Sequence, residues 1–207
     1  MSVPAAAPRP VLADLLPGGL PRAAAVPRSR ARLRDAALVL GGAALVAGIG
    51  QVAVPLPFTP VPLTLGTFAV LLVGAALGPA RGALSIAVFL LAGVAGAPVF
   101  ADGTSGAAFA SFGYAVGYLP AAALLGWLAR RGGDRSPWRT ALAAVVSTAV
   151  VYTVGVPWLM AFLGIGLGEA LVIGVAPFLV GDAIKAIAAA TLLPSAWRVL
   201  GERGARR

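Results

Sequence analysis

The chain contains no cysteine and no histidine among its 207 residues. It therefore has no disulfide framework and no thiolate metal site, and it lacks the side chain that most often serves as a metal ligand or general base. Asparagine is absent too, and Gln51 is the only residue with an amide side chain. The sequence has no GxxxxGK[ST] loop to hold nucleotide phosphates, so we do not expect this chain to drive transport with ATP by itself. These absences disfavour most hydrolytic and redox chemistries, and we expect neither an enzyme nor a bound metal or cofactor.

Charged residues are also scarce, at 11% of the chain, whereas hydrophobic residues make up 59%. This composition is too apolar for an ordinary soluble domain and predicts an integral membrane protein. The formal net charge is +9, which in a soluble protein would suggest nucleic acid. Here the arginines are grouped at the ends of apolar runs, a pattern typical of orientation in a bilayer. The expected surroundings are therefore membrane lipid, and nucleic acid is not an expected partner.

The distribution of apolar residues predicts three parts. We expect residues 1–35 to form a disordered basic arm rich in Pro, Ala and Arg, residues 36–198 a membrane domain of six helices, and residues 199–207 a basic tail. The six apolar stretches lie at about 36–53, 63–77, 82–96, 113–129, 140–163 and 169–193. The second and third are shorter than the roughly 20 residues that a span normally needs.

Between the first two stretches, residues 54–62 contain four prolines in nine residues. Proline has no N–H and a fixed φ, so this segment is predicted to be a stiff extended loop rather than a helix.

Charge placement predicts the orientation. With six spans, all fifteen arginines fall on the side of the two termini, and the opposite loops, at 54–62, 97–112 and 164–168, contain no Arg or Lys. By the positive-inside rule both termini are then cytoplasmic in a multi-pass protein of the bacterial cell membrane. Five or seven spans would put arginines outside.

Lys185 is the only lysine, and it lies one helical turn after Asp182 inside the apolar run 170–193. Residues three apart share a helix face. Each charge costs about 3 kcal/mol at membrane depth, so the two should face each other or a polar cavity. Pro177 and Gly181 loosen the helix beside them and leave backbone and space open. The pair predicts a ligand site for a small amphiphilic acid, and a purely structural ion pair is the alternative.

Two other interpretations concern Lys185 and the aromatic residues. A serine with Lys185 would be a nucleophilic dyad, but no serine lies close in sequence and Asp182 would keep the lysine charged. Aromatic residues at Tyr114, Tyr118, Tyr152 and Trp158 would wall an apolar pocket, although aromatics near span ends are more often interface anchors.

Small residues recur four apart in the first span, at Ala37 and Gly41, Ala43 and Ala47, and Ala44 and Gly48. Such rows allow another helix to approach closely. Packing within the bundle and docking of a partner membrane protein both remain open, and for docking the expected surface lies around Ala43, Ala47 and Gly48.

Four stretches carry a resemblance to a known family. They are PFTPVPLTL at 57–65, LGPARG at 77–82, GVAGAPVFA at 93–101 and PFLVGDAIK at 177–185. In their order and spacing the chain resembles the BioY family, the biotin-specific substrate-binding (S) components of energy-coupling factor (ECF) transporters, over about residues 36–195. One departure is ASFGY at 110–114, where the family usually has Pro-Thr-Gly-Gly-Tyr, so that Phe112 stands in place of a glycine.

The resemblance implies an all-α, six-transmembrane-helix bundle of the ECF S-component type. It implies high-affinity biotin binding and uptake across the cytoplasmic membrane, together with a transmembrane coupling (T) protein and two ATPase subunits. Asp182 and Lys185 match the acidic and basic ligand-site residues of the family. The full set of expected ligand-binding residues is Asp182, Lys185, Thr59, Phe100, Ser111, Tyr114, Tyr152 and Trp158.

Two rival functions have their own expectations. An ion-coupled carrier of another small carboxylate would use Asp182 as a proton relay, and its uptake would depend on pH or membrane potential. A purely structural membrane subunit would bind no ligand. Neither accounts for the four matching stretches. Whether the energising module is dedicated or shared, and whether the protein acts alone or as a homo-oligomer, is left open by the sequence.

Overall fold

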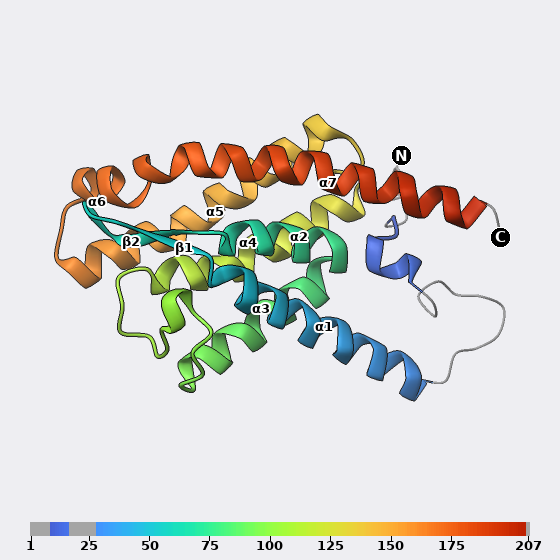
Figure 1. Ribbon diagram of the computed structural model, residues 1–207, viewed down its shortest axis with the longest axis horizontal. Coiled ribbons are helices and arrows are strands. Elements are labelled where there is room, and N and C mark those ends of the chain that lie inside the picture. The colour runs from blue at the N-terminus through green and yellow to red at the C-terminus, as the bar shows by residue number, and fades with distance from the viewer. Residues whose placement is uncertain (1–8, 17–27, 206–207) are drawn as a thin grey trace, which may run out of the picture.

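The computed structural model describes residues 9–16 and 28–205. In that part the chain is an elongated bundle of helices with one β-hairpin (Figure 1). The helices are α1 (Arg28–Gly50), α2 (Gly66–Leu77), α3 (Pro79–Val94), α4 (Phe112–Arg130), α5 (Pro137–Leu163), α6 (Leu167–Gly174) and α7 (Leu179–Ala205). Three short 3-10 helices are η1 (Leu12–Leu15), η2 (Ala101–Gly103) and η3 (Ala176–Phe178), and the strands are β1 (Ala53–Leu56) and β2 (Thr59–Thr64).

Four helical segments are long and apolar enough to cross a membrane: Arg28–Gly50, Phe112–Arg130, Pro137–Leu163 and Leu167–Leu200. The helices α2 and α3 are apolar but shorter. Large apolar side chains lie on the outside of the bundle, such as Leu91, which is 70% exposed, and Val180, which is 72% exposed. An apolar exterior suits lipid and not water. The expected helical bundle is confirmed, with one β-hairpin that the all-α prediction did not include, and the count of six spans stays a prediction.

The short helices α2 and α3 are held close to the centre of the bundle by glycines. A Cβ at Gly74 would lie 2.8 Å from the carbonyl oxygen of Ala122 on α4, so only glycine allows this approach. Gly78, with φ +83°, forms the turn between α2 and α3, and Pro79 begins α3 at the position where a missing N–H costs nothing. The central helix is α4, which packs against α2, α3 and α5.

The proline-rich segment 54–62 is extended, as predicted, but the prediction that it is a loop is wrong. It forms most of an antiparallel hairpin in which Ala53 pairs with Thr64 and Leu56 with Thr59. The register is irregular between Val54 and Leu56, where Pro55 supplies no N–H to the ladder. Figure 1 shows the hairpin reaching from the end of α1 toward α6 and the start of α7.

The predicted disordered arm over 1–35 differs from the structure in its described parts. Residues 28–35 already belong to α1, and residues 9–16 pack against the bundle through Val11, which is 0% exposed. The carboxylate of Asp14 lies 2.9 Å from Arg81 Nη1, and the same guanidinium lies 2.9 Å from Asp35. The burial of Val11 and the ion pair between Asp14 and Arg81 hold this segment against the bundle, although the composition of the arm is typical of disorder. The rest of the arm lies outside the described residues, and at the other end α7 continues to Ala205, through most of the predicted tail.

Candidate functional site

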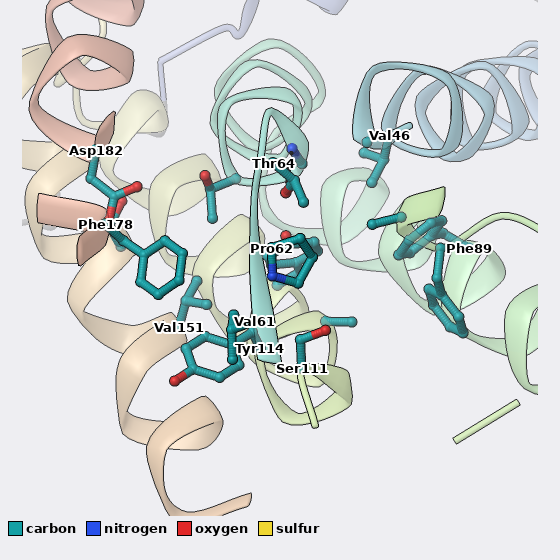
Figure 2. Close-up of a pocket in the computed structure, with 18 of the residues that line it drawn as sticks. Val46, Val61, Pro62, Thr64, Phe89, Ser111, Tyr114, Val151, Phe178 and Asp182 are labelled. Atoms are coloured by element: carbon teal, nitrogen blue, oxygen red, sulfur yellow. Dashed lines mark hydrogen bonds between the residues drawn. The ribbon is translucent and has the colours of Figure 1, made fainter. Parts of the chain in front are cut away.

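A cavity with an empty volume of about 750 Å³, counted out to its mouth, lies inside the bundle beside the hairpin. Figure 2 shows strand β2 running across it, with Asp182 and Phe178 on one side and Phe89 and Val46 on the other. The polar residues that line it are Thr64, Thr67, Ser111, Tyr114, Tyr118, Thr148, Tyr152, Asp182 and Lys185.

The ion pair of α7 faces this cavity. Lys185 Nζ lies 3.1 Å from Asp182 Oδ1 and donates a second hydrogen bond to Thr67 Oγ1, at 2.9 Å. The hydroxyl of Tyr152 on α5 donates to the other carboxylate oxygen of Asp182. An ammonium has three protons and a carboxylate has about four acceptor positions, so both groups retain capacity for a ligand. Lys185 is only 7% exposed, and in this dry position such bonds are stronger than in water.

The side chain of Leu63 on β2 lies against α7 beside the ion pair. A Cβ at Gly181 would lie 2.9 Å from Cδ1 of Leu63 on β2. Glycine next to Asp182 therefore leaves room for the Leu63 side chain beside the pair. This role differs in detail from the prediction that Gly181 loosens the helix, because here the freed space is filled by the hairpin. Pro177 lies in η3, where the path from α6 into α7 is broken into separate helices.

The other side of the cavity is aromatic. The ring of Phe100, which is buried, lies 5.2 Å from Phe89 and 5.3 Å from Phe109, measured between ring centroids. Gly93 leaves the space that the Phe100 ring occupies. The cavity thus joins a polar side, with one cation and one anion, to an apolar side.

Of the eight predicted ligand-binding residues, six line the cavity: Phe100, Ser111, Tyr114, Tyr152, Asp182 and Lys185. Ser111 directly precedes α4, and Tyr114 donates from its hydroxyl to Gly174 O at 2.9 Å, which ties α4 to α6. Their contact with a ligand stays a prediction.

Thr59 and Trp158 do not line the cavity. Thr59 is the first residue of β2, next to the hairpin turn, and its Oγ1 accepts the N–H of Val61 at 3.2 Å. Trp158 is six residues after Tyr152, so on a helix with 3.6 residues per turn the two side chains point about 120° apart. Its Nε1 donates to Phe109 O at 3.0 Å, and its ring supports Phe112 behind the aromatic wall.

The predicted ligand-binding set omitted Thr67, Tyr118 and Phe178 among the lining residues, although Tyr118 was among the aromatic residues expected to wall the pocket. Thr67 and Tyr118 are polar groups inside apolar runs, which is the same signal that selected Tyr114 and Tyr152. That signal was sufficient to find them. Phe178 carries no such signal, since an apolar residue before a helix is ordinary. Phe112, the departure from the family pattern, packs between Phe100 and Trp158 at centroid distances of 6.0 and 5.3 Å.

The fold and the cavity define a multi-pass membrane protein with an internal site that holds one ion pair. The model of the BioY family matches residues 24–202. The chain belongs to the BioY family, as the four sequence stretches predicted.

Relatives of known name are similar over most of their length. The biotin transporter BioY of Rhizobium etli is 36% identical over 170 residues, which cover 77% of this chain and 90% of the relative. The probable biotin transporter BioY of Pyrococcus horikoshii is 39% identical over 130 residues, or 63% of this chain and 76% of the relative. Among solved structures, the S-component for biotin from an ECF-type ABC transporter is similar with a TM-score of 0.72 and 26% identity, covering 83% of this chain and 94% of that one.

Proposed function

We propose that this protein binds biotin with high affinity and serves as the substrate-specific subunit of an ECF-type transporter that takes up biotin across the cytoplasmic membrane. Family membership and the biotin S-component of similar fold support the class. The observation that carries the proposal is the Asp182–Lys185 pair, fixed by Thr67 and Tyr152 at the edge of the cavity.

The chemistry of biotin suits this cavity. Its ureido group has two N–H donors and a carbonyl oxygen, its valerate ends in a carboxylate, and the rest of the molecule is largely apolar. In the proposed complex Asp182 accepts from a ureido N–H, and the remaining Lys185 proton is donated to a ligand oxygen. Phe100 and the tyrosines Tyr114 and Tyr152 enclose the apolar part, and the hydroxyl of Ser111 is a further polar contact.

The membrane arrangement is part of the proposal. Six spans with both termini in the cytoplasm are supported by the arginine distribution and by the six apolar segments, four long and two short. Because the sequence has no phosphate-binding loop, ATP hydrolysis falls to two separate ATPase subunits joined through a T protein.

The docking face for the T protein is the outer side of α1. Ala37, Gly41, Ala44 and Gly48 are exposed there, and a Cβ at Gly41 or Gly48 would meet nothing within 4 Å. A neighbouring helix packs closely against such a stripe. Ala43, by contrast, is 7% exposed and belongs to the interior of the bundle.

Tracer biotin binding to the purified protein in detergent tests the function. We expect saturable binding with a nanomolar constant, which corresponds to about 12 kcal/mol, and displacement by unlabelled biotin. Uptake into vesicles that carry the T protein and the ATPases should require ATP. The absence of saturable biotin binding would refute the proposal. Uptake that depends on pH or membrane potential and needs no ATPases would favour an ion-coupled carrier.

A further inference from the structure

Gln51, the only amide side chain of the protein, joins the end of α1 to the loop between α3 and α4. Its Nε2 donates to the carbonyl oxygens of Val99, at 3.1 Å, and Phe100, at 2.9 Å. Its Oε1 accepts the N–H of Gly103 at 3.0 Å. A third acceptor, Ala47 O, lies 3.3 Å from Nε2 within the preceding helix. One side chain therefore uses both its donor and its acceptor atoms on the backbone of a single loop.

That loop carries part of the cavity wall. Val99, Phe100 and Ala101 are consecutive lining residues, and Phe100 is only 3% exposed. Its ring fills the space beside Gly93 and lies edge-on to Phe89. A displacement of this loop would remove Phe100 and open the aromatic side of the cavity.

The loop has few other ties, one of which is the hydrogen bond from Trp158 Nε1 on α5 to Phe109 O, at 3.0 Å. Asp102 has φ +55°, a left-handed conformation that aspartate adopts more readily than most other residues with a side chain. Phe100 N–H donates to Thr104 O at 3.1 Å within the loop, and Gly106 N–H donates to Gly93 O at 2.8 Å at the end of α3. Across the described part of the chain, the hydrogen bonds between this loop and the segment from α1 to β2 all come from Gln51.

We infer that Gln51 is a latch that holds Phe100 in the cavity wall and thereby sets how fast a solute enters and leaves. The side chain is exposed, so water can replace its bonds one by one as the latch opens. The ion pair on α7 takes no part in this movement, because Thr67 and Tyr152 hold it from α2 and α5. Gln51 acts through Phe100 and is a positioning residue. For the identity of the solute, the inference rests on the proposed biotin binding.

A single-cysteine reporter tests the latch without any ligand. The protein has no cysteine, and Ala115 on α4 lines the cavity with 7% exposure, so Ala115→Cys introduces one sheltered thiol. In this background Gln51→Ala should raise the rate of reaction with a small water-soluble thiol reagent by about tenfold, as expected for the loss of two or three modest hydrogen bonds. Gln51→Glu keeps the acceptor for Gly103 but loses both donors, and it should also raise the rate.

A matched control is Thr153→Ala on α5, an exposed residue whose hydroxyl donates only to Val150 O, at 2.7 Å. It should leave the thiol rate unchanged. Melting temperature and elution profile check that each variant is folded, and Gln51→Glu decides the case where Gln51→Ala does not fold. Equal thiol rates in the parent and in a folded Gln51 variant overturn the latch.

Biotin kinetics separate this inference from the proposed function. In Gln51→Ala we expect both association and dissociation of biotin to accelerate, by about tenfold each, with a smaller change in Kd. Binding of biotin by the parent together with unchanged rates in Gln51→Ala overturns the latch and leaves the function standing. A parent that does not bind biotin, with a faster thiol reaction in Gln51→Ala, supports the latch and removes the function.

Discussion

Replacing the two members of the ion pair separately should give unequal losses of biotin affinity. In Asp182→Asn the carboxamide keeps the size of the side chain and its oxygen still accepts from Tyr152 or Lys185, but the anion is lost. We expect biotin binding to weaken by about 2 kcal/mol, the scale of a charge-assisted hydrogen bond, or roughly 30-fold in Kd.

Lys185→Ala should cost more. It removes the bond to the ligand oxygen and also leaves Asp182 Oδ1 and Thr67 Oγ1 without their donor. Removing one partner of a buried ion pair typically costs about 3 to 5 kcal/mol, because the other charge stays buried and unpaired. Part of that cost falls on the folded state, so the melting temperature should fall together with a loss of affinity above 100-fold, on the order of 3 kcal/mol.

Calorimetry and thermal melting on the same purified variants separate the two effects. Thr191→Ala is a matched control, because Thr191 is exposed on α7 and donates only to Ala188 O, at 2.9 Å. It should change neither quantity. A pair that is merely structural gives a different pattern, in which both variants lose melting temperature while the folded fraction binds biotin normally. Normal affinity in folded Lys185→Ala would refute the site.

Two further predictions concern other parts of the molecule. Burial raises the pKa of Asp134 in the α4–α5 loop, where Oδ2 accepts from Trp197 Nε1 at 2.6 Å and Oδ1 has no partner in the described chain. Because the native state then favours the protonated acid, the melting temperature should fall as pH rises from about 4, the ordinary pKa of aspartate, through the raised pKa. Asp134→Asn should remove this dependence of the melting temperature on pH. If the melting temperature of Asp134→Asn depends on pH as it does in the parent, another group causes the dependence. Ala44→Trp on the outer face of α1 should abolish co-purification with the T protein and leave biotin affinity unchanged, whereas undiminished co-purification would remove this face as the docking surface.

Local chemistry made much of the fold predictable. Apolar length predicted where α1 to α5 lie, but the single stretch predicted at 169–193 is divided into α6, η3 and α7. The spacing of Asp182 and Lys185 predicted their contact, since residues three apart on a helix meet. The proline segment 54–62 was predictable as extended because φ is fixed within each residue. The pairing of its two strands was not predictable, since hydrogen bonding between β1 and β2 depends on which N–H groups the prolines leave free and on how the hairpin packs against the rest of the bundle.

The site was predictable only where a polar residue interrupts an apolar run. This signal found the ion pair and Tyr152, but the partner that fixes Lys185 is Thr67, 118 residues away, and no local pattern joins the two. Trp158 was assigned to the site because aromatic residues near charged pairs often form walls, and the helical period places it on another face. Residues 11–14 were missed because a single buried valine and one carboxylate hardly change the composition of a basic segment.

The two sides of the cavity are held in physically different ways, and this separates affinity from rate. The polar side consists of side chains on α2, α5 and α7, bonded to one another in a dry environment, so a change there alters the bound state directly and appears mainly in Kd. The aromatic side includes Phe100, on a loop that an exposed amide ties to α1, so a change at Gln51 lowers the barrier in both directions and appears mainly in the rates. A double variant of Gln51→Ala with Asp182→Asn should therefore show additive effects, because the two sites share no bonded partner. Strong coupling between them, beyond about 0.5 kcal/mol, would mean that the loop also contributes to holding the bound ligand.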